Sequence, residues 1–174
     1  MDKKEFEQIY KMYADMLYRT AYRMVKNDAD ALDIVQEAFI RIYNGIDKFR
    51  NQSNIRTWMY RIVMNLCYDH FRRRKKVSFI SENEEFNLDG KQESFASDSI
   101  NEIDNLEEQR KQNLHRALEY LTFRQRTVFN LRIYEELPYE EIARIMRVRI
   151  GTAKATFFQA VEKLKVIMKE MEKK

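Results

Sequence analysis

Apolar residues recur every three or four positions through most of this chain, with one long interruption between Val77 and Asp104. This spacing puts apolar side chains along one face of an α-helix, whereas a half-buried strand would alternate them. The 174 residues include only 3 glycines and 1 proline, which disfavours the many tight turns of a β fold. We therefore expect an all-α protein with helices on both sides of the interruption.

The part of the chain before the interruption contains three apolar stripes, in residues 6–25, 34–46 and 55–66. Asn27 and Asp28 separate the first two stripes and offer a cap for the second helix. Three helices with facing stripes make a small bundle, which we expect in residues 1–76.

Helical periodicity returns after the interruption, first in residues 114–121 and then in a helix over residues 124–134. Pro138 suits the start of a short helix that runs to Met146. After a link at residues 147–151, a long helix is expected to begin at Thr152. A short helix, a tight turn and a second helix are typical of a helix-turn-helix, although an ordinary helical hairpin has the same pattern.

Charge divides the chain at the same places. Residues 1–76 carry 16 Lys and Arg against 10 Asp and Glu, residues 77–108 carry 1 against 10, and residues 109–174 carry 15 against 8. Two basic blocks around an acidic spacer indicate two units that meet a polyanion, joined by a flexible linker over residues 77–104 that avoids it. Two solvated helical surfaces and a solubilising linker would give the same pattern.

The chain offers little for metal binding or membrane insertion. Its one cysteine, Cys67, cannot form a disulfide within the chain, which fits a reducing cytoplasm. Cys67, His70 and His115 cannot complete a four-ligand zinc site without carboxylates, so we expect no metal and no cofactor. No stretch approaches the ~20 apolar residues that span a bilayer. We therefore expect a cytoplasmic protein without membrane insertion.

The third predicted helix is both basic and aromatic. Residues 48–76 hold 9 Lys and Arg against one acid, with five aromatic side chains interleaved. Unpaired bases stack on aromatic rings while cations hold the sugar-phosphate backbone, and each stacked base contributes ~1–3 kcal/mol. This composition is typical of a surface that binds nucleic acid, and the run at 72–76 is predicted to contact phosphates.

Three stretches together resemble a known family. They are Asp28–Phe39, Arg56–Asn65, and Tyr139–Ala143 with Gly151–Lys154. In this order, around an acidic segment, they resemble the sigma-70 superfamily, specifically its extracytoplasmic-function (ECF) group, which keeps only regions two and four.

The resemblance implies a sigma factor, which is not an enzyme. Such a protein binds core RNA polymerase, recognises promoter DNA and promotes strand opening for transcription initiation, and an anti-sigma factor is a further expected partner. Residues 1–76 would correspond to region 2, residues 77–104 to the linker and residues 105–174 to region 4. The upstream promoter element would be read by region 4.

The resemblance also implies roles for individual residues of the first part of the chain. The side chains expected to dock on core polymerase are Asp33, Gln36 and Glu37. Those expected to melt the promoter and read its downstream element are Phe49, Arg50, Arg56, Tyr60, Arg61 and Asn65. Those expected to contact phosphates are Arg72, Arg73, Arg74 and Lys75. Leu32 stands where the family usually has an acid, which would make the docking surface more apolar here.

In the second part, the upstream element would be contacted by the start of the last helix and by the turn before it. The residues concerned are Arg147, Arg149, Thr152, Lys154, Ala155 and Phe158. Arg147 replaces the usual glycine of the turn, Arg149 replaces a common serine cap, and Ala155 and Thr156 follow the lysine where Ser-Arg is common. Promoter preference therefore cannot be carried over from relatives.

Two further functions remain compatible with parts of the pattern. A helix-turn-helix regulator that binds duplex DNA alone would explain residues 109–174 but not the basic aromatic helix. A nuclease that uses Glu140 and Glu141 is disfavoured, because adjacent residues on a helix point apart and the helix N-terminus explains both acids. A protein-binding adaptor has no specific feature in its favour.

Overall fold

The computed structural model describes residues 2–49, 54–80 and 102–172. The elements within these ranges are α1 (Lys3–Val25), α2 (Asp28–Gly45), the short 3₁₀ helix η1 (Ile46–Lys48), α3 (Ile55–Ile80), α4 (Glu102–Glu119), α5 (Phe123–Ile133), α6 (Tyr139–Met146) and α7 (Ile150–Met171). The described part of the chain contains no strand, and the all-α prediction is confirmed.

Local signals set the ends of the first helices. Asp2 accepts a hydrogen bond from the backbone N–H of Glu5 (2.8 Å) while the Glu5 carboxylate accepts from that of Asp2 (3.0 Å), and this reciprocal pair caps α1. Asn27 caps α2 as predicted, accepting from the Asp30 N–H at 2.9 Å. Gly45 ends α2 beside α3, where a Cβ atom at this position would lie 3.0 Å from the Trp58 ring. Helices α1, α2 and α3 therefore form the expected bundle.

The bundle buries the central part of each apolar stripe. The residues of α1–α3 with no exposed surface include Leu17, Ala21, Met24, Ala31, Ala38, Ile42, Met59, Val63 and Cys67.

The second half begins its helices with equally local devices. Thr122 and Gln125 form a reciprocal cap at α5, and α6 starts directly after Pro138. The turn between α6 and α7 passes through Arg147, whose φ of 54° lies in the left-handed region that favours glycine. Helix α7 begins at Ile150, two residues before the predicted start at Thr152, so Gly151 belongs to its first turn. The pair α6–α7 has the connection expected of a helix-turn-helix.

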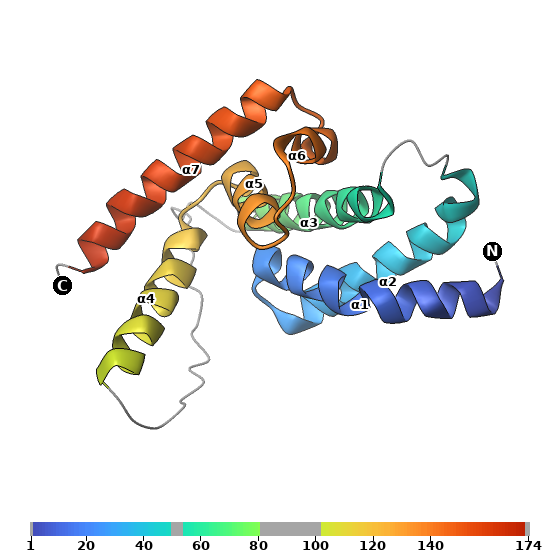
Figure 1. Ribbon diagram of the computed structural model, residues 1–174, viewed down its shortest axis with the longest axis horizontal. Helices are drawn as coiled ribbons and strands as arrows, with labels where there is room; N and C mark the ends of the chain where they lie inside the picture. The colour runs from blue at the N-terminus through green and yellow to red at the C-terminus, as the bar shows by residue number, and fades with distance from the viewer. Residues whose placement is uncertain (1, 50–53, 81–101, 173–174) are drawn as a thin grey trace.

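The two halves of the chain are packed against each other. Helix α6 lies on α3 and α5 lies on α1, while α4 and α7 pack on each other and extend beyond the first three helices (Figure 1). One continuous core cluster contains Leu17, Met24 and Val63 from the first half and Val128 and Ile142 from the second. A smaller cluster fills the space between α4, α5 and α7. The sequence indicated two domains but not this contact between them.

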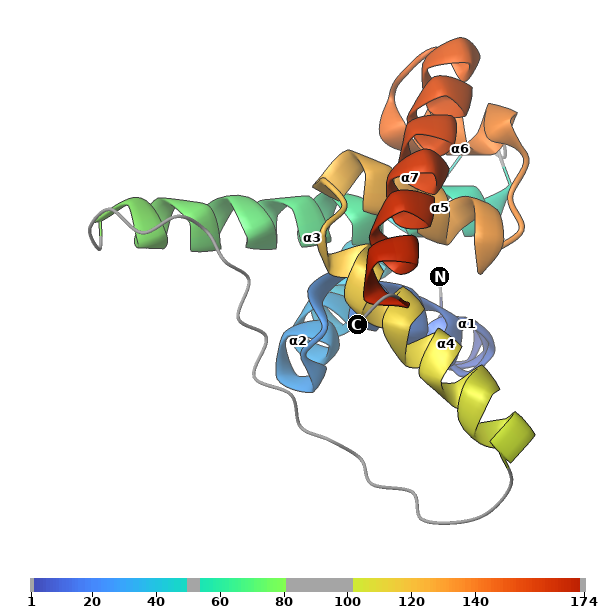
Figure 2. The same ribbon diagram turned by 90° about the vertical axis from the view of Figure 1, so that its left-hand side faces the viewer.

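Helices α3 and α4 extend into the segment that was predicted as a linker, residues 77–104. Helix α3 continues to Ile80 and α4 begins at Glu102. The remainder of the segment lies outside the described residues. The C-terminal end of α3 projects sideways beyond the packed helices, as Figure 2 shows.

None of the helices within the described ranges is long and apolar enough to cross a membrane.

Candidate nucleic-acid interface

The outer face of α2 carries the residues predicted to dock on polymerase. Asp33, Gln36 and Glu37 are all exposed, and their spacing of three and four puts them on one face of the helix. Leu32 and Ile40 extend this face with exposed apolar surface, at 51% and 56% accessibility. The result is a mixed acidic and apolar surface, as the leucine at position 32 led us to expect.

A groove of about 580 Å³ runs beside this face, between α2 and α3. Acidic and basic side chains contact each other along its rim. Glu37 accepts a hydrogen bond from Arg41 at 2.9 Å, and Asp30 lies 3.4 Å from the His70 ring nitrogen and 3.9 Å from the Arg74 guanidinium. Because both members of the Glu37–Arg41 pair are about half exposed (47% each), the pair contributes little to stability and can be exchanged for a partner's charges.

The residues predicted to read the melted strand are divided between two stripes of α3. Arg56 and Tyr60, four residues apart, share the stripe that faces α6 and the turn before it, and the Arg56 guanidinium lies 3.3 Å from the Tyr60 hydroxyl. Arg61 and Asn65 share the neighbouring stripe, where Asn65 is exposed. Tyr60 has no exposed surface at all.

The loop that precedes α3 supplies the remaining predicted residues. The Phe49 ring packs on Trp58, with 5.2 Å between ring centroids. Trp58 is partly buried against the core, as its place on the apolar stripe indicated. Arg50 lies outside the described residues.

The projecting end of α3 carries the predicted phosphate contacts. Arg72, Arg73 and Arg74 are exposed. Arg72 lies 3.3 Å from the Asp69 carboxylate, within its own helix. Lys75 belongs to the same helix, but its side chain is outside the described part of the structure. The Arg74 guanidinium turns back toward Asp30 of α2, 3.9 Å away, so this exposed arginine run lies beside the N-terminal end of α2.

The helix-turn-helix presents its predicted reading residues to solvent. Those exposed are Arg147, Arg149, Thr152, Lys154, Ala155 and Phe158. Phe158 is 65% exposed, whereas its neighbour Phe157 turns inward and stacks on Phe129 at 6.3 Å between centroids. The Lys154 ammonium lies over the Tyr139 ring, 5.7 Å from its centroid, which orients the lysine at the start of α7.

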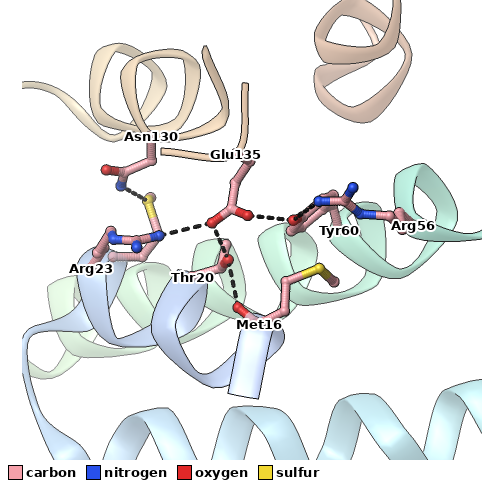
Figure 3. A network of polar contacts seen from close by, with 8 residues as sticks. Met16, Thr20, Arg23, Arg56, Tyr60, Asn130 and Glu135 are labelled. Atoms are coloured by element: carbon pink, nitrogen blue, oxygen red, sulfur yellow. Dashed lines mark hydrogen bonds and ion pairs between the residues drawn. The ribbon is translucent and has the colours of Figure 1, made fainter. Parts of the chain in front are cut away.

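A carboxylate from the second half binds directly to the first. Glu135, in the turn between α5 and α6, reaches down to side chains of α1 and α3 (Figure 3). One of its oxygens accepts hydrogen bonds from the Thr20 hydroxyl at 2.7 Å and the Arg23 guanidinium at 2.8 Å. The other oxygen accepts a hydrogen bond from the Tyr60 hydroxyl. The Glu135 side chain is only 7% exposed, so a charged group is held in the contact by three donors.

Further polar contacts join the two halves around Glu135. The Thr57 hydroxyl donates to the Glu141 carboxylate at 2.5 Å. The buried Arg126 guanidinium donates to the Met24 carbonyl at 3.1 Å, and the Asn130 amide lies 3.1 Å from the Met24 sulfur. The second half therefore covers the stripe of α3 that contains Thr57 and Tyr60.

The same contact changes the ionisation of its members. Burial, together with the hydrogen bond to Glu135, raises the pKa of the Tyr60 phenol. The hydrogen bond to Tyr60 raises the pKa of the Arg56 guanidinium. Burial raises the pKa of the Cys67 thiol to about 12, so this cysteine stays protonated and unreactive.

No sequence pattern pointed to Glu135, Thr57 or Arg126. Arg126 lies on the buried side of α5. A charged residue among apolar neighbours is a sequence signal for a buried polar contact, and this signal could have identified Arg126. Glu135 lies in a turn, where an acid is ordinarily solvated, and nothing local distinguishes it from Glu136. Among the described residues, no group of three His, Cys, Asp or Glu side chains is placed to hold a metal ion.

Family models match both halves of the chain. The model for sigma-70 region 2 matches residues 9–77, and the model for sigma-70 region 4 matches residues 111–164.

Curated relatives match along most of their length. RNA polymerase sigma factor SigV of Bacillus subtilis is 32% identical over 150 residues, covering 86% of this chain and 82% of SigV. ECF RNA polymerase sigma factor SigW of the same species is 31% identical, covering 98% and 92%. The ECF sigma-E factor of Escherichia coli is 32% identical, covering 92% and 85%.

Solved structures share the fold. The sigma factor RpoE of Bartonella quintana, solved in complex with the anti-sigma factor NepR, superposes with a TM-score of 0.73 at 23% identity, covering 95% of this chain and 98% of that one. CnrH, solved with the cytosolic domain of CnrY, superposes with a TM-score of 0.68 at 19% identity, covering 97% and 90%.

Proposed function

The chain belongs to the ECF group of the sigma-70 family, and from that premise we propose how its surfaces share the work of a sigma factor. A sigma factor is not an enzyme. It directs core RNA polymerase to promoters, recognises promoter DNA and takes part in initiating transcription. We assign residues 1–76 to region 2, residues 77–104 to the linker and residues 105–174 to region 4.

The exposed face of α2 is the proposed docking surface for core polymerase. Asp33 and Glu37 supply negative charge there, Gln36 supplies hydrogen-bonding groups, and Leu32 and Ile40 supply apolar surface at the edge. A small apolar patch beside charges is typical of a protein-protein interface, where charge fixes orientation and apolar contact supplies affinity.

Helix α3 and the loop before it are the proposed melting and downstream-element surface. Phe49 and Tyr60 offer rings on which extruded bases can stack, Arg56 and Arg61 offer cations, and Asn65 can both donate to and accept from a base edge. The guanidinium groups of Arg72–Arg74, and Lys75 beside them, would hold duplex phosphates. These phosphate contacts position the DNA without reading its sequence.

The start of α7 is the proposed reader of the upstream element. In a helix-turn-helix the first residues of the second helix enter the major groove. Lys154 can donate to guanine or phosphate, and Ala155 and Phe158 can contact a thymine methyl group. Arg147 and Arg149 flank this surface and favour phosphate contacts, while Thr152 lies between them and the lysine.

The exposure of this cationic helix start, in a chain that also carries a region 2 bundle, is the observation that carries the proposal. We further propose that the protein works in the cytoplasm, where its polymerase and DNA are. An anti-sigma factor is a proposed regulatory partner, since two proteins of the same fold were solved in complexes with such partners or with a partner's cytosolic domain.

In vitro transcription with purified core polymerase over a random promoter library, followed by sequencing of transcript starts, tests the function. The expected result is start sites that share two elements and that depend on this protein. A gel shift without polymerase discriminates the regulator alternative, because a regulator binds specific duplex alone. Specific binding without polymerase, and no start-site selection with it, would overturn the proposal.

Single substitutions test the division of work. Lys154→Ala should weaken selection of the upstream element only, and Arg56→Ala should reduce open-complex formation about tenfold at unchanged polymerase affinity. Glu37→Lys should reduce polymerase affinity itself. Lys163→Ala, at an exposed position far along α7 from the reading residues, is the matched control for lost positive charge. Equal effects of Lys154→Ala and Lys163→Ala would remove the assignment to α7.

A further inference from the structure

The stripe of α3 assigned to the melted strand is occupied by carboxylates of the chain's own second half. Glu135 binds Tyr60, and Glu141 binds Thr57 one turn earlier on α3. Both side chains offer oxygen acceptors, as the phosphates of a DNA strand do, and both lie in the cleft beside Arg56. A strand cannot reach Tyr60 while Glu135 holds it.

We propose that region 4 is an internal competitor of the promoter strand and that Glu135 is the clasp that keeps the free protein closed. The inference rests on the proposed function of the α3 surface. Opening of the contact between α5–α6 and α1–α3 would then be a required step before strand capture.

The geometry of Glu135 suits a clasp rather than an incidental contact. Its carboxylate bridges two helices of the first half, because Thr20 and Arg23 belong to α1 and Tyr60 belongs to α3. The side chain of Thr20 is completely buried, and the Arg23 guanidinium also lies over the Tyr134 ring, 4.3 Å from its centroid. Removing any one of the three donors leaves part of this buried carboxylate unpaired and therefore weakens the contact.

The turn that carries Glu135 is itself held in place. The backbone N–H groups of Glu135 and Leu137 donate to the carbonyls of Asn130 and Leu131, at 3.2 and 3.0 Å. The Arg132 guanidinium donates to the Leu137 carbonyl at 3.0 Å. The clasp is therefore presented by a rigid turn, and its release moves region 4 as a body.

Glu136 provides a matched control, because it is the next residue of the same turn, has the same charge and is exposed. Glu135→Gln keeps the size of the side chain and removes the charge that the three donors stabilise. Glu136→Gln removes the same charge from solvent. Thr20→Val, which deletes one donor from a buried position outside the proposed DNA surface, should act in the same direction as Glu135→Gln with a smaller effect.

Opening can be measured by the rate at which a thiol at the covered stripe is modified. Thr57→Cys places the thiol under region 4, at a position that is 3% exposed, in a full-length chain with Cys67→Ala. A second chain with Ala38→Cys reports global unfolding, because Ala38 is buried in α2 within the first bundle. The modification rate at each position is proportional to the population in which that position is open.

We expect Glu135→Gln to raise the modification rate at position 57 at least about tenfold without changing the rate at position 38. Glu136→Gln should change neither rate. An unchanged rate at position 57, or equal increases at positions 57 and 38, would overturn the proposal, since the first means that Glu135 holds nothing and the second means that it only stabilises the fold.

Binding of a fluorescent 20-nucleotide single-stranded DNA of random sequence separates this proposal from the proposed function. Glu135→Gln should bind the oligonucleotide more tightly by the same factor by which the open population rises. Adding Arg56→Ala to that variant should remove the gain. If the thiol rate rises but DNA affinity does not, the clasp stands and the assignment of the α3 stripe to the melted strand falls.

Discussion

The two DNA-facing surfaces of the molecule differ in access, although both are cationic and both belong to helices. At the start of α7, Arg149, Lys154 and Phe158 are exposed to solvent. On α3, Tyr60 is buried beneath the turn that joins α5 to α6, and Thr57 is buried beneath α6. The surface assigned to intact duplex is therefore exposed in the free protein, whereas the surface assigned to separated strands is covered. This order matches the order of events at a promoter, where duplex is met before it is opened.

The largest effect is expected from shortening the segment between the two surfaces, because both must reach their promoter elements at the same time. Promoter elements one to two helical turns apart lie ~35–70 Å from each other. Between the end of α3 and the start of α4, residues 81–101 can span at most about 70 Å, and half of them about 35 Å. Deleting half should therefore lower promoter-directed transcription at least about a hundredfold while co-purification with core polymerase persists. A Gly/Ser replacement of equal length is the control, and full activity of the shortened chain would mean that one surface suffices.

Removing the buried guanidinium at position 126 should destabilise the fold that keeps the α3 surface covered. Arg126 donates to the carbonyls of Leu118, Glu119 and Met24 at 3.0–3.1 Å. Arg126→Met leaves these acceptors without their donor and should lower the free energy of unfolding by about 3 kcal/mol in urea titrations. Arg124→Met, at an exposed position of the same helix, should change it by less than about 0.5 kcal/mol. An equal decrease in the free energy of unfolding for Arg126→Met and Arg124→Met would show that the hydrogen bonds of Arg126 contribute nothing to stability.

Two residues with left-handed backbone conformation, one beside each surface, allow the effect of backbone strain to be compared between the two surfaces. Glu136 lies in the turn beside the covered surface and Arg147 in the turn beside the open one, each with φ of 54°. Replacing either by glycine should raise the free energy of unfolding by about 1 kcal/mol, because glycine adopts this conformation without steric penalty. Only Arg147→Gly should weaken duplex binding by the polymerase complex. Weaker binding in both variants would mean that the turns, and not the arginine, set affinity.

Acidification should produce the smallest effect, at the edge of the contact between the halves. The His115 ring nitrogen lies 3.2 Å from the Lys26 ammonium. Burial and the neighbouring Lys26 lower the pKa of His115 from its usual 6.5, with Glu108 opposing and Arg23 adding to the shift. The folded protein thus binds this proton less readily than the unfolded chain, so stability is complete above pH 6.5 and declines as the pH falls below it. His115→Gln should make the melting temperature less dependent on pH in this range. An unchanged pH dependence would mean that another group causes the loss of stability.

The sequence predicted what depends on neighbours along the chain. Among the described residues, periodicity located most helices because each buries one stripe, and Asn27 and Pro138 marked helix starts because caps act within a single turn. Only the end of α4 was located, since this helix begins at Glu102, well before the expected return of periodicity at Leu114. The start of α7 was placed two residues too late, because Gly151 was interpreted as part of the link although the first turn of the helix accommodates it. The candidate surfaces on α2 and α7 were predicted from a resemblance, and their residues are exposed together.

The contact between the halves could not be predicted in the same way. Glu135 and Tyr60 are separated by 75 residues, and no spacing rule joins them. Glu135 and Glu136 are identical locally, and only the packing of α5 and α6 on α1 and α3 buries one and exposes the other. The assignment of Tyr60 to the melted strand remains a prediction that requires the halves to separate.

The continuous core has a consequence for the separated state. Leu137, Ile142 and Ile145 of the second half are buried in one cluster with Leu17 and Val63 of the first. Parting the halves exposes such side chains to water, and a contiguous apolar patch promotes association with other molecules. A chain whose halves are separated and that is not bound to polymerase should therefore be prone to aggregation. Overproduction of a permanently extended variant should yield aggregates unless the polymerase is supplied with it.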